Sequence, residues 1–253
     1  MSSLTIGAIV FACVFAGALF GMFLGRVLPK EHLSAEAKDV IKVTMAMIAT
    51  LAALVLGLLT ASAKSSLDDK ENELRAWSAQ VVLLDRTLAE YGPETQETRA
   101  LIKRNLESRI EEMWPGQGSR ATPEVIGSGT GIENVQQKLL ALDPQTDAQR
   151  WLKSTALTIS GTMAAARWTG LQEIGSSIQW PFMAVLVFWL AVIFASFGLF
   201  APRNVIVTAA LLVAALSVAG SIYLILEMDQ PYGGLIKISS APVRTALEQL
   251  GKP

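Results

Sequence analysis

The chain has 253 residues, of which 51% are hydrophobic and 17% charged, and its formal net charge at pH 7 is -1. This composition is too apolar for an ordinary soluble domain of that length and indicates a membrane protein, while the interleaved charges argue against a surface that binds nucleic acid. The single cysteine, Cys13, excludes an intrachain disulfide and a Cys-rich zinc site, and we expect no metal and no cofactor.

The first predicted transmembrane helix covers residues 4–25, an apolar run without a charge. Because this run has no basic region before it and is longer than the core of a signal peptide, we expect it to be a retained span. Gly17, Gly21 and Gly25 recur every four residues, which places them on one face where two helix backbones can approach closely. The spacing leaves open whether the partner helix belongs to the same chain.

The second predicted span, residues 43–63, is also free of charges and is long enough to cross a hydrocarbon core of about 30 Å. No proline or turn signal follows it, so we expect one helix to continue to Tyr91, where Gly92-Pro93 ends it. Beyond the membrane this helix carries a heptad-like apolar stripe. The stripe consists of Leu67, Leu74, Trp77, Val81, Leu84, Leu88 and Tyr91.

The region between the second and third spans, residues 64–179, is expected to be a helical extramembrane domain. Apolar side chains at three- and four-residue steps predict amphipathic helices over residues 94–113, 132–142 and 148–172. The first of these is expected to fold back along the preceding long helix as an antiparallel hairpin. The glycine-rich end of the loop at 119–131 lacks the Lys-Ser/Thr pair of a P-loop and no strand precedes it, so we expect no nucleotide site.

Two transmembrane hairpins are therefore predicted, over residues 1–63 and 180–226. The spans of the second hairpin cover residues 182–200 and 205–226, and the connection between them is too short for anything but a tight reversal. Four spans place both termini and the helical domain on one side of the membrane. Near the span ends, six Lys or Arg residues lie on that side and five on the other, a difference of one that favours the cytoplasm. The sequence predicts an all-α, polytopic membrane protein.

The C-terminal part, residues 227–253, is predicted to be a turn, a short strand-like stretch and a short helix. We expect Asp229 to accept N–H bonds from the turn backbone and Tyr232 to anchor at the headgroups. With Pro231 and Gly234, these residues resemble the signature of the bestrophin-like family of bacterial membrane proteins, in which the last span ends in an Asp-x-Pro-aromatic-x-Gly turn. The order of spans and helices along nearly the whole chain is similar to that family.

The resemblance implies an oligomeric anion channel of the bacterial inner (plasma) membrane, in which the second span lines the pore and cytoplasmic helices extend it. No match to the acidic calcium clasp of bestrophins is present, so we expect no calcium site. Candidates for the pore lining on the second span are Thr44, Met47, Leu51, Leu54 and Leu58. The Thr and Ser hydroxyl groups of this span do not require a pore, because Thr and Ser in membrane helices usually hydrogen-bond to their own backbone.

Residue chemistry argues against catalysis and against proton or cation transport. The predicted spans hold no Asp, Glu, Lys, Arg or His between their ends, and the helical domain offers no convergent set of titratable groups, so we expect no enzyme. An anion channel needs no such group, because apolar constrictions and hydroxyl or backbone dipoles can build its pore. The alternative is a non-conducting, membrane-anchored scaffold. For both roles we expect a homo-oligomer in membrane lipid, with small anions as a further partner of the channel. The candidates for the oligomer interface are Gly17, Gly21, Gly25, Trp77, Val81, Leu84 and Leu88.

Overall fold

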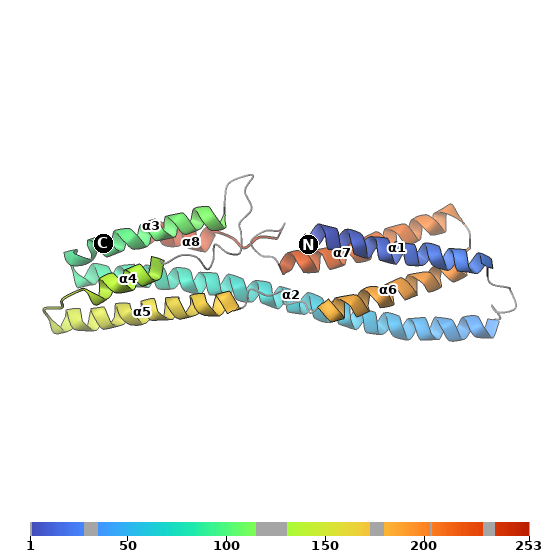
Figure 1. The fold of residues 1–253 in the computed structure, drawn as a ribbon, viewed down its shortest axis with the longest axis horizontal. Coiled ribbons are helices and arrows are strands. Elements are labelled where there is room, and N and C mark those ends of the chain that lie inside the picture. Colours follow the sequence, from blue (N-terminus) through green and yellow to red (C-terminus); the bar gives the residue numbers. More distant parts are fainter. Residues whose placement is uncertain are drawn as a thin grey trace. The chain divides into compact units, whose positions relative to one another are not determined.

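The computed structural model describes residues 2–27, 35–114, 131–172, 180–202, 204–229 and 236–252. Within these ranges every regular element is a helix, which confirms the predicted all-α fold (Figure 1). The strand-like stretch expected before the last helix is wrong, because residues 236–240 form bends and irregular chain. The elements are α1 (Ser3–Val27), α2 (Ala35–Tyr91), the 3-10 turn η2 (Pro93–Thr95), α3 (Gln96–Met113), α4 (Gly131–Leu140), α5 (Asp147–Gln172), α6 (Trp180–Phe200), α7 (Val205–Met228) and α8 (Ala241–Gln249).

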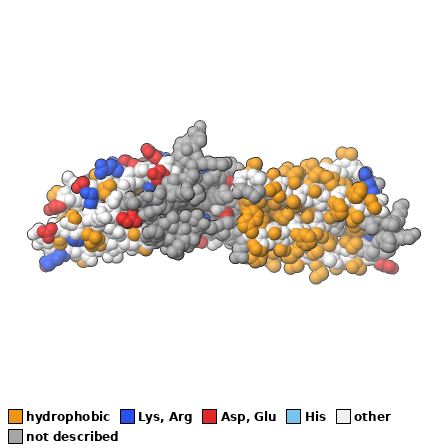
Figure 2. Space-filling model, viewed as in Figure 1, with side chains coloured by type: hydrophobic (Ala, Val, Ile, Leu, Met, Phe, Trp, Pro, Cys, Tyr) orange, Lys and Arg blue, Asp and Glu red, His pale blue; other side chains and the backbone are white. Residues whose placement is uncertain are grey.

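Four helices, α1, α2, α6 and α7, are long and apolar enough to cross a membrane. They confirm the four predicted spans, since each holds the roughly 20 apolar residues that a bilayer core requires. The last span reaches Met228 rather than residue 226, so Glu227 lies inside the final turn of α7. Figure 2 shows apolar side chains covering the surface formed by the spans, whereas charged side chains scatter over the visible surface of the extramembrane helices.

The helix α2 runs from a membrane span into a charged segment without interruption over 57 residues. It begins at Ala35 rather than at the predicted Val43 and ends at the predicted Tyr91. Gly92 follows with a φ of 139°, a backbone conformation that residues with a side chain rarely adopt. Pro93 then lacks the N–H that another helical turn would need. The single long helix expected from the sequence is confirmed.

Two compact units divide the chain between them. We call Met1–Ser66 together with Ser176–Asp229 the membrane unit, and Leu67–Gly175 together with Gln230–Pro253 the helical unit. The two membrane hairpins therefore form one unit. The C-terminal segment after α7 belongs to the same unit as the extramembrane helices, although it is covalently attached to a membrane span.

Within the membrane unit, α1 packs against both α6 and α7. The helices α1 and α6 run parallel with a constant offset, since Gly17 lies against the backbone of Ala191 and Gly25 against that of Leu199. Small residues at these positions let the two backbones approach closely, which is how helices gain packing energy in lipid. The buried apolar core of this unit includes Val10, Val14, Ala18, Leu186, Phe194, Ala215, Ile222 and Ile225.

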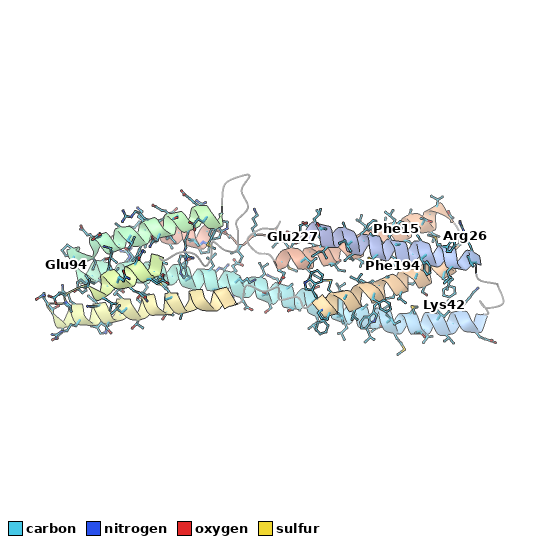
Figure 3. All side chains as sticks on the ribbon, in the orientation of Figure 1. Phe15, Arg26, Lys42, Glu94, Phe194 and Glu227 are labelled. Carbon is cyan, nitrogen blue, oxygen red and sulfur yellow. The ribbon has the colours of Figure 1, made fainter. Side chains whose placement is uncertain are left out.

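Charged side chains mark the two ends of the membrane unit. Figure 3 shows Arg26 near the end of α1 and Lys42 near the start of α2 at one end, and Glu227 at the opposite end. The aromatic rings of Phe15 and Phe194 lie between these levels. This distribution fits a bilayer, in which charges stay near the interfaces and apolar rings occupy the hydrocarbon.

The helical unit has a core of its own, to which α2, α3, α4, α5 and α8 contribute. Helix α3 folds back on α2, as predicted, and Arg99 on α3 pairs with Asp85 on α2. The turn is fixed by Thr95, whose buried hydroxyl lies 2.5 Å from the Leu88 carbonyl and 2.8 Å from the Gly92 carbonyl. The predicted antiparallel hairpin is confirmed. The core residues include Leu84, Leu88, Ile102, Leu106, Val135, Leu139, Ala156 and Val243.

Candidate functional site

Helix α2 presents two different faces within the membrane unit. Its residues Ala52, Leu59 and Ala63 are buried in the core of that unit. The opposite face is open and apolar, with exposed fractions of 66% for Met47, 49% for Leu51, 70% for Leu54 and 65% for Leu58.

All five candidates for the pore lining lie together on this open face. Thr44, also exposed, precedes Met47 by three residues, and the other members follow at steps of four, three and four, which aligns them along one side of a helix. We call Thr44, Met47, Leu51, Leu54 and Leu58 the α2 stripe. The structure brings the predicted candidates onto one continuous surface that no other described part of the chain covers.

The hydroxyl groups of this span are bonded to the helix itself. The hydroxyl of Thr44 donates to the carbonyl of Val40 at 2.9 Å, and Thr50 and Thr60 make the same bond to the carbonyl four residues earlier. Such back-bonding is the common arrangement for Thr in membrane helices. It uses the hydroxyl proton of Thr44 within the helix, so the α2 stripe offers no free side-chain donor and is otherwise apolar.

The three glycines predicted at an oligomer interface pack against another helix of the same chain. A Cβ atom on Gly17 would lie 2.6 Å from the carbonyl oxygen of Ala191, and Gly21 and Gly25 meet the backbone of α6 in the same way. The close approach expected from their spacing is present. Its partner is α6 of the same chain, and a role of Gly17, Gly21 and Gly25 in an oligomer contact stays a prediction.

The heptad-like stripe of the extramembrane part of α2 is also covered within one chain. Val81, Leu84 and Leu88 are almost completely buried in the core of the helical unit. Trp77 is half-buried, and the Arg109 guanidinium carbon lies 5.9 Å from the centre of its ring, within cation–π range. The helices α3, α4, α5 and α8 together cover more of this stripe than one hairpin partner would, and its role in an oligomer contact stays a prediction.

The C-terminal turn is described in part. Asp229 directly follows α7, and its backbone N–H donates to the Ile225 carbonyl at 3.3 Å. Pro231, Tyr232 and Gly234 lie outside the described residues, and the expected turn bonds of Asp229 stay a prediction.

A family model for the bestrophin-like domain matches residues 12–243 of the chain. The match begins in the first membrane helix and ends inside α8, so it includes both units. The chain belongs to the bestrophin-like family. No curated protein and no solved structure matches it. Membership confirms the family predicted from the sequence, and with the four apolar helices it identifies a membrane protein.

The helical unit of this bestrophin-like protein contains a buried charged network that sequence reasoning missed. Asp85 on α2 is 1% exposed and accepts two hydrogen bonds from Arg99 on α3, at 2.8 and 2.9 Å. The hydrogen bond that Arg99 donates to Asp85 raises the pKa of Arg99 above its ordinary value, so the guanidinium stays charged. The signal was present in the sequence, because an acid between Leu84 and Leu88 interrupts an otherwise apolar face.

A second buried carboxylate lies at the end of the last span. Glu227 is almost fully buried, and Tyr223 one turn earlier is its hydrogen-bond partner. Gly7 lies against Tyr223, so Ser3, one turn before Gly7 on the antiparallel helix α1, lies near the level of Glu227. The buried Ser3 hydroxyl has no hydrogen-bond partner among the described residues. Glu227 lies beyond the predicted end of this span at residue 226, whereas the helix continues to Met228.

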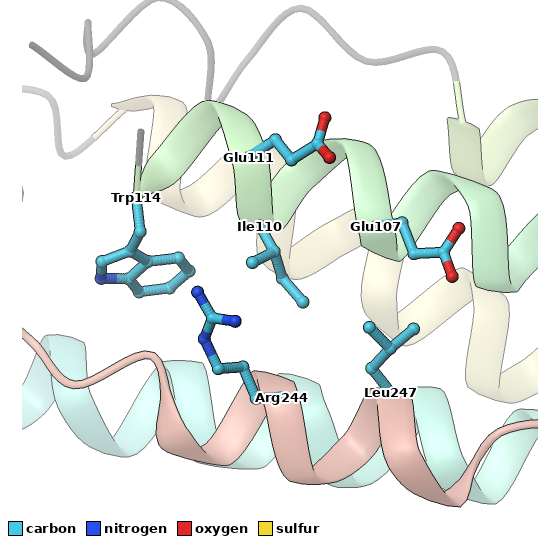
Figure 4. Close-up of a pocket in the computed structure, with 6 residues that line it drawn as sticks. All are labelled: Glu107, Ile110, Glu111, Trp114, Arg244 and Leu247. Atoms are coloured by element: carbon cyan, nitrogen blue, oxygen red, sulfur yellow. The ribbon is translucent and has the colours of Figure 1, made fainter. Parts of the chain in front are cut away.

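A shallow pocket of about 280 Å³ lies in the helical unit between α3 and α8 (Figure 4). Ile110, Leu247 and the Trp114 indole give it an apolar wall, and Figure 4 shows the Arg244 guanidinium reaching toward that indole. The remaining lining residues are Glu107 and Glu111. All three charged side chains are exposed, which leaves them without the burial that activates catalytic groups. In the described part of the chain, no group of three or more His, Cys, Asp or Glu residues could hold a metal ion.

Proposed function

We propose that this bestrophin-like protein is a subunit of an oligomeric channel for small anions, and that the α2 stripe lines the conducting path. The observation that carries the proposal is the open face of α2. In the most apolar stretch of α2, only 11% of the residues are buried inside the chain. The corresponding share is 33% in α1, 33% in α6 and 22% in α7. The least covered span is therefore the one with the most surface available for a path or for neighbouring subunits.

The continuity of α2 supports the same helix as the path-lining element. In the described chain it is the one helix shared by the membrane unit and the helical unit. A path lined by any other described span would pass to different elements at the membrane surface, whereas α2 can line a pore and its extramembrane extension without a break.

The chemistry of the α2 stripe supports gating by an apolar constriction. Leu51, Leu54 and Leu58 project from one face and the threonine hydroxyls are engaged with the backbone. A ring of leucines contributed by several subunits would exclude water from a narrow path and so oppose ion passage until it widens. The proposed selectivity for anions is supported by the family resemblance and by no residue of this chain. The proposed role is non-enzymatic.

Assembly in this proposal uses surfaces that the chain leaves open. The glycine face of α1 and the heptad-like stripe of α2 are engaged within one chain, so subunit contacts would form on the flanks of the α2 stripe. We further propose that the helical unit and both termini lie in the cytoplasm of a bacterial inner membrane. Labelling of Thr158→Cys in intact cells with a membrane-impermeant thiol reagent tests this orientation. Labelling of that residue from outside would show that the helical unit lies on the external side.

Chloride efflux from proteoliposomes tests the path directly. The parent should release chloride, and Leu54→Ser should release it severalfold faster because a polar group lowers the cost of wetting the constriction. Leu216→Ser is the matched control, since Leu216 is 58% exposed on α7 and lies outside the stripe. If both variants accelerated chloride efflux equally, the α2 stripe would not line the path and would face lipid instead.

The rival proposal, a non-conducting scaffold, makes the opposite prediction for the same vesicles. Neither the parent nor Leu54→Ser would then release chloride, while native mass spectrometry would still show an oligomer. Labelling of Leu54→Cys in a Cys13→Ala background adds an independent readout, because a charged thiol reagent modifies a water-lined position and spares one that faces lipid.

A further inference from the structure

The last described helix, α8, docks into the helical unit by one apolar side. Val243, Ala246 and Leu250, spaced by three and four residues, are buried in the same core as α3. Upstream of the helix, Ile238 is buried and its carbonyl accepts the indole N–H of Trp114 at 3.0 Å. The segment therefore occupies the unit in the way that an amphipathic peptide helix occupies a groove.

Charged groups hold the chain immediately after α8. The Gly251 N–H donates to the Asp85 carboxylate at 3.1 Å. The next carbonyl, that of Lys252, accepts hydrogen bonds from Arg99 at 3.0 Å and from Arg86 at 3.2 Å. The C-terminal segment thus joins α2 and α3 at the single buried carboxylate that links those two helices.

The backbone at Gly251 makes this arrangement possible. Its φ of 79° lies in the left-handed region, which glycine adopts without the steric conflict that a side chain would bring. A left-handed residue after the last turn is a common way to end a helix. Here it turns the chain so that one N–H faces Asp85 and the following carbonyl faces the arginines.

The docked segment is expected to open as a unit. Helix α8 has nine residues, too few to remain helical in water without its partner surface. The charge-assisted bonds that hold it are stronger than neutral ones but are confined to its C-terminal end. The α2–α3 hairpin, α4 and α5 keep core contacts of their own, so local opening can precede unfolding of the rest.

The C-terminal segment connects the last membrane helix to the helical unit, so its opening would affect that connection. Helix α7 belongs to the membrane unit, and the segment that follows it belongs to the helical unit. We propose that residues 236–252 form a releasable latch, locked by Asp85 and Arg99, that couples the fourth membrane helix to the helical unit. When the latch opens, α7 loses its docked connection to the helical unit. The inference holds whether or not the protein conducts ions.

Hydrogen exchange on the full-length protein in nanodiscs tests the latch. In Asp85→Asn, amides of residues 241–252 should exchange about 10- to 100-fold faster, as expected for the loss of hydrogen bonds to a charged group, while amides of α5 keep their rates. Gly251→Ala should accelerate the same segment about tenfold, because the left-handed backbone becomes strained. Asp147→Asn is the matched control, since it removes an exposed carboxylate that pairs with Arg150 in the same unit.

Two results would overturn the proposal. The first is unchanged exchange of the C-terminal segment in both variants. The second is an equal acceleration of α3, α5 and the C-terminal segment, which would show that the Asp85 network stabilises the whole unit and that no separate latch opens. If Asp85→Asn fails to fold, Gly251→Ala decides the question, because Gly251 is exposed and outside the core.

Discussion

The substitution Gly21→Ala tests the packing of α1 on α6 in the membrane unit. A Cβ at this position would overlap the carbonyl oxygen of Ala195 and would lie 2.7 Å from its carbonyl carbon and 2.9 Å from its Cα. These are backbone atoms and cannot rotate away. Because carbon atoms in contact are about 3.5 Å apart or more, α1 and α6 must separate locally by about 1 Å.

The expected loss follows from that displacement. A gap of about 0.5–1 Å removes a quarter to a half of the dispersion attraction across an interface, and overpacking by one methyl group typically costs about 1–3 kcal/mol. Since α1 contacts both α6 and α7, we expect Gly21→Ala to lower the free energy of unfolding by about 3 kcal/mol. Gly57 on α2 is the matched control, because a Cβ there meets no other atom within 4 Å, and Gly→Ala inside an open helix stabilises by up to about 1 kcal/mol.

Reversible unfolding in mild detergent, with the same denaturant series for both variants, measures the difference. Gly21→Ala should unfold at a lower midpoint than the parent, and Gly57→Ala at the same or a higher one. Equal midpoints would refute the close approach of α1 and α6. Loss of oligomers without a change in the unfolding midpoint would return the glycine face to a contact between subunits.

Three further predictions concern the helical unit. Arg99→Ala leaves the buried Asp85 carboxylate without its cation and should cost about 3–5 kcal/mol in denaturant unfolding; replacing both residues by Leu should cost less, and a larger loss in the double variant would contradict the reasoning. Trp114→Phe removes an indole hydrogen bond of 3.0 Å and should cost about 1 kcal/mol; an unchanged midpoint would mean that this bond adds nothing. The hydrogen bond from Lys138 lowers the pKa of Glu97, so its contribution is present at neutral pH and is lost as the pH falls through the lowered value. NMR titration of Lys138→Ala should return the pKa of Glu97 to its ordinary range, and an unaltered titration would exclude the pair.

The sequence by itself determined the membrane spans, the long helix α2 and the family. Uncharged runs such as residues 182–200 can satisfy their backbone in lipid only as helices, so composition and length suffice to identify them. The continuation of α2 to Tyr91 could be predicted because helix termination is local chemistry, supplied here by Gly92 and Pro93. The α2 stripe could be proposed for the same reason, since side-chain spacing fixes which residues share a face.

Only the tertiary structure decided what each face packs against. The spacing of Gly17, Gly21 and Gly25 predicts a close helix partner equally well within one chain or between two, and the structure supplies α6. The buried pair of Asp85 and Arg99 depends on residues 14 positions apart across a turn, a distance over which helical periodicity carries no information. Periodicity identifies a surface, whereas its partner depends on the path of the whole chain.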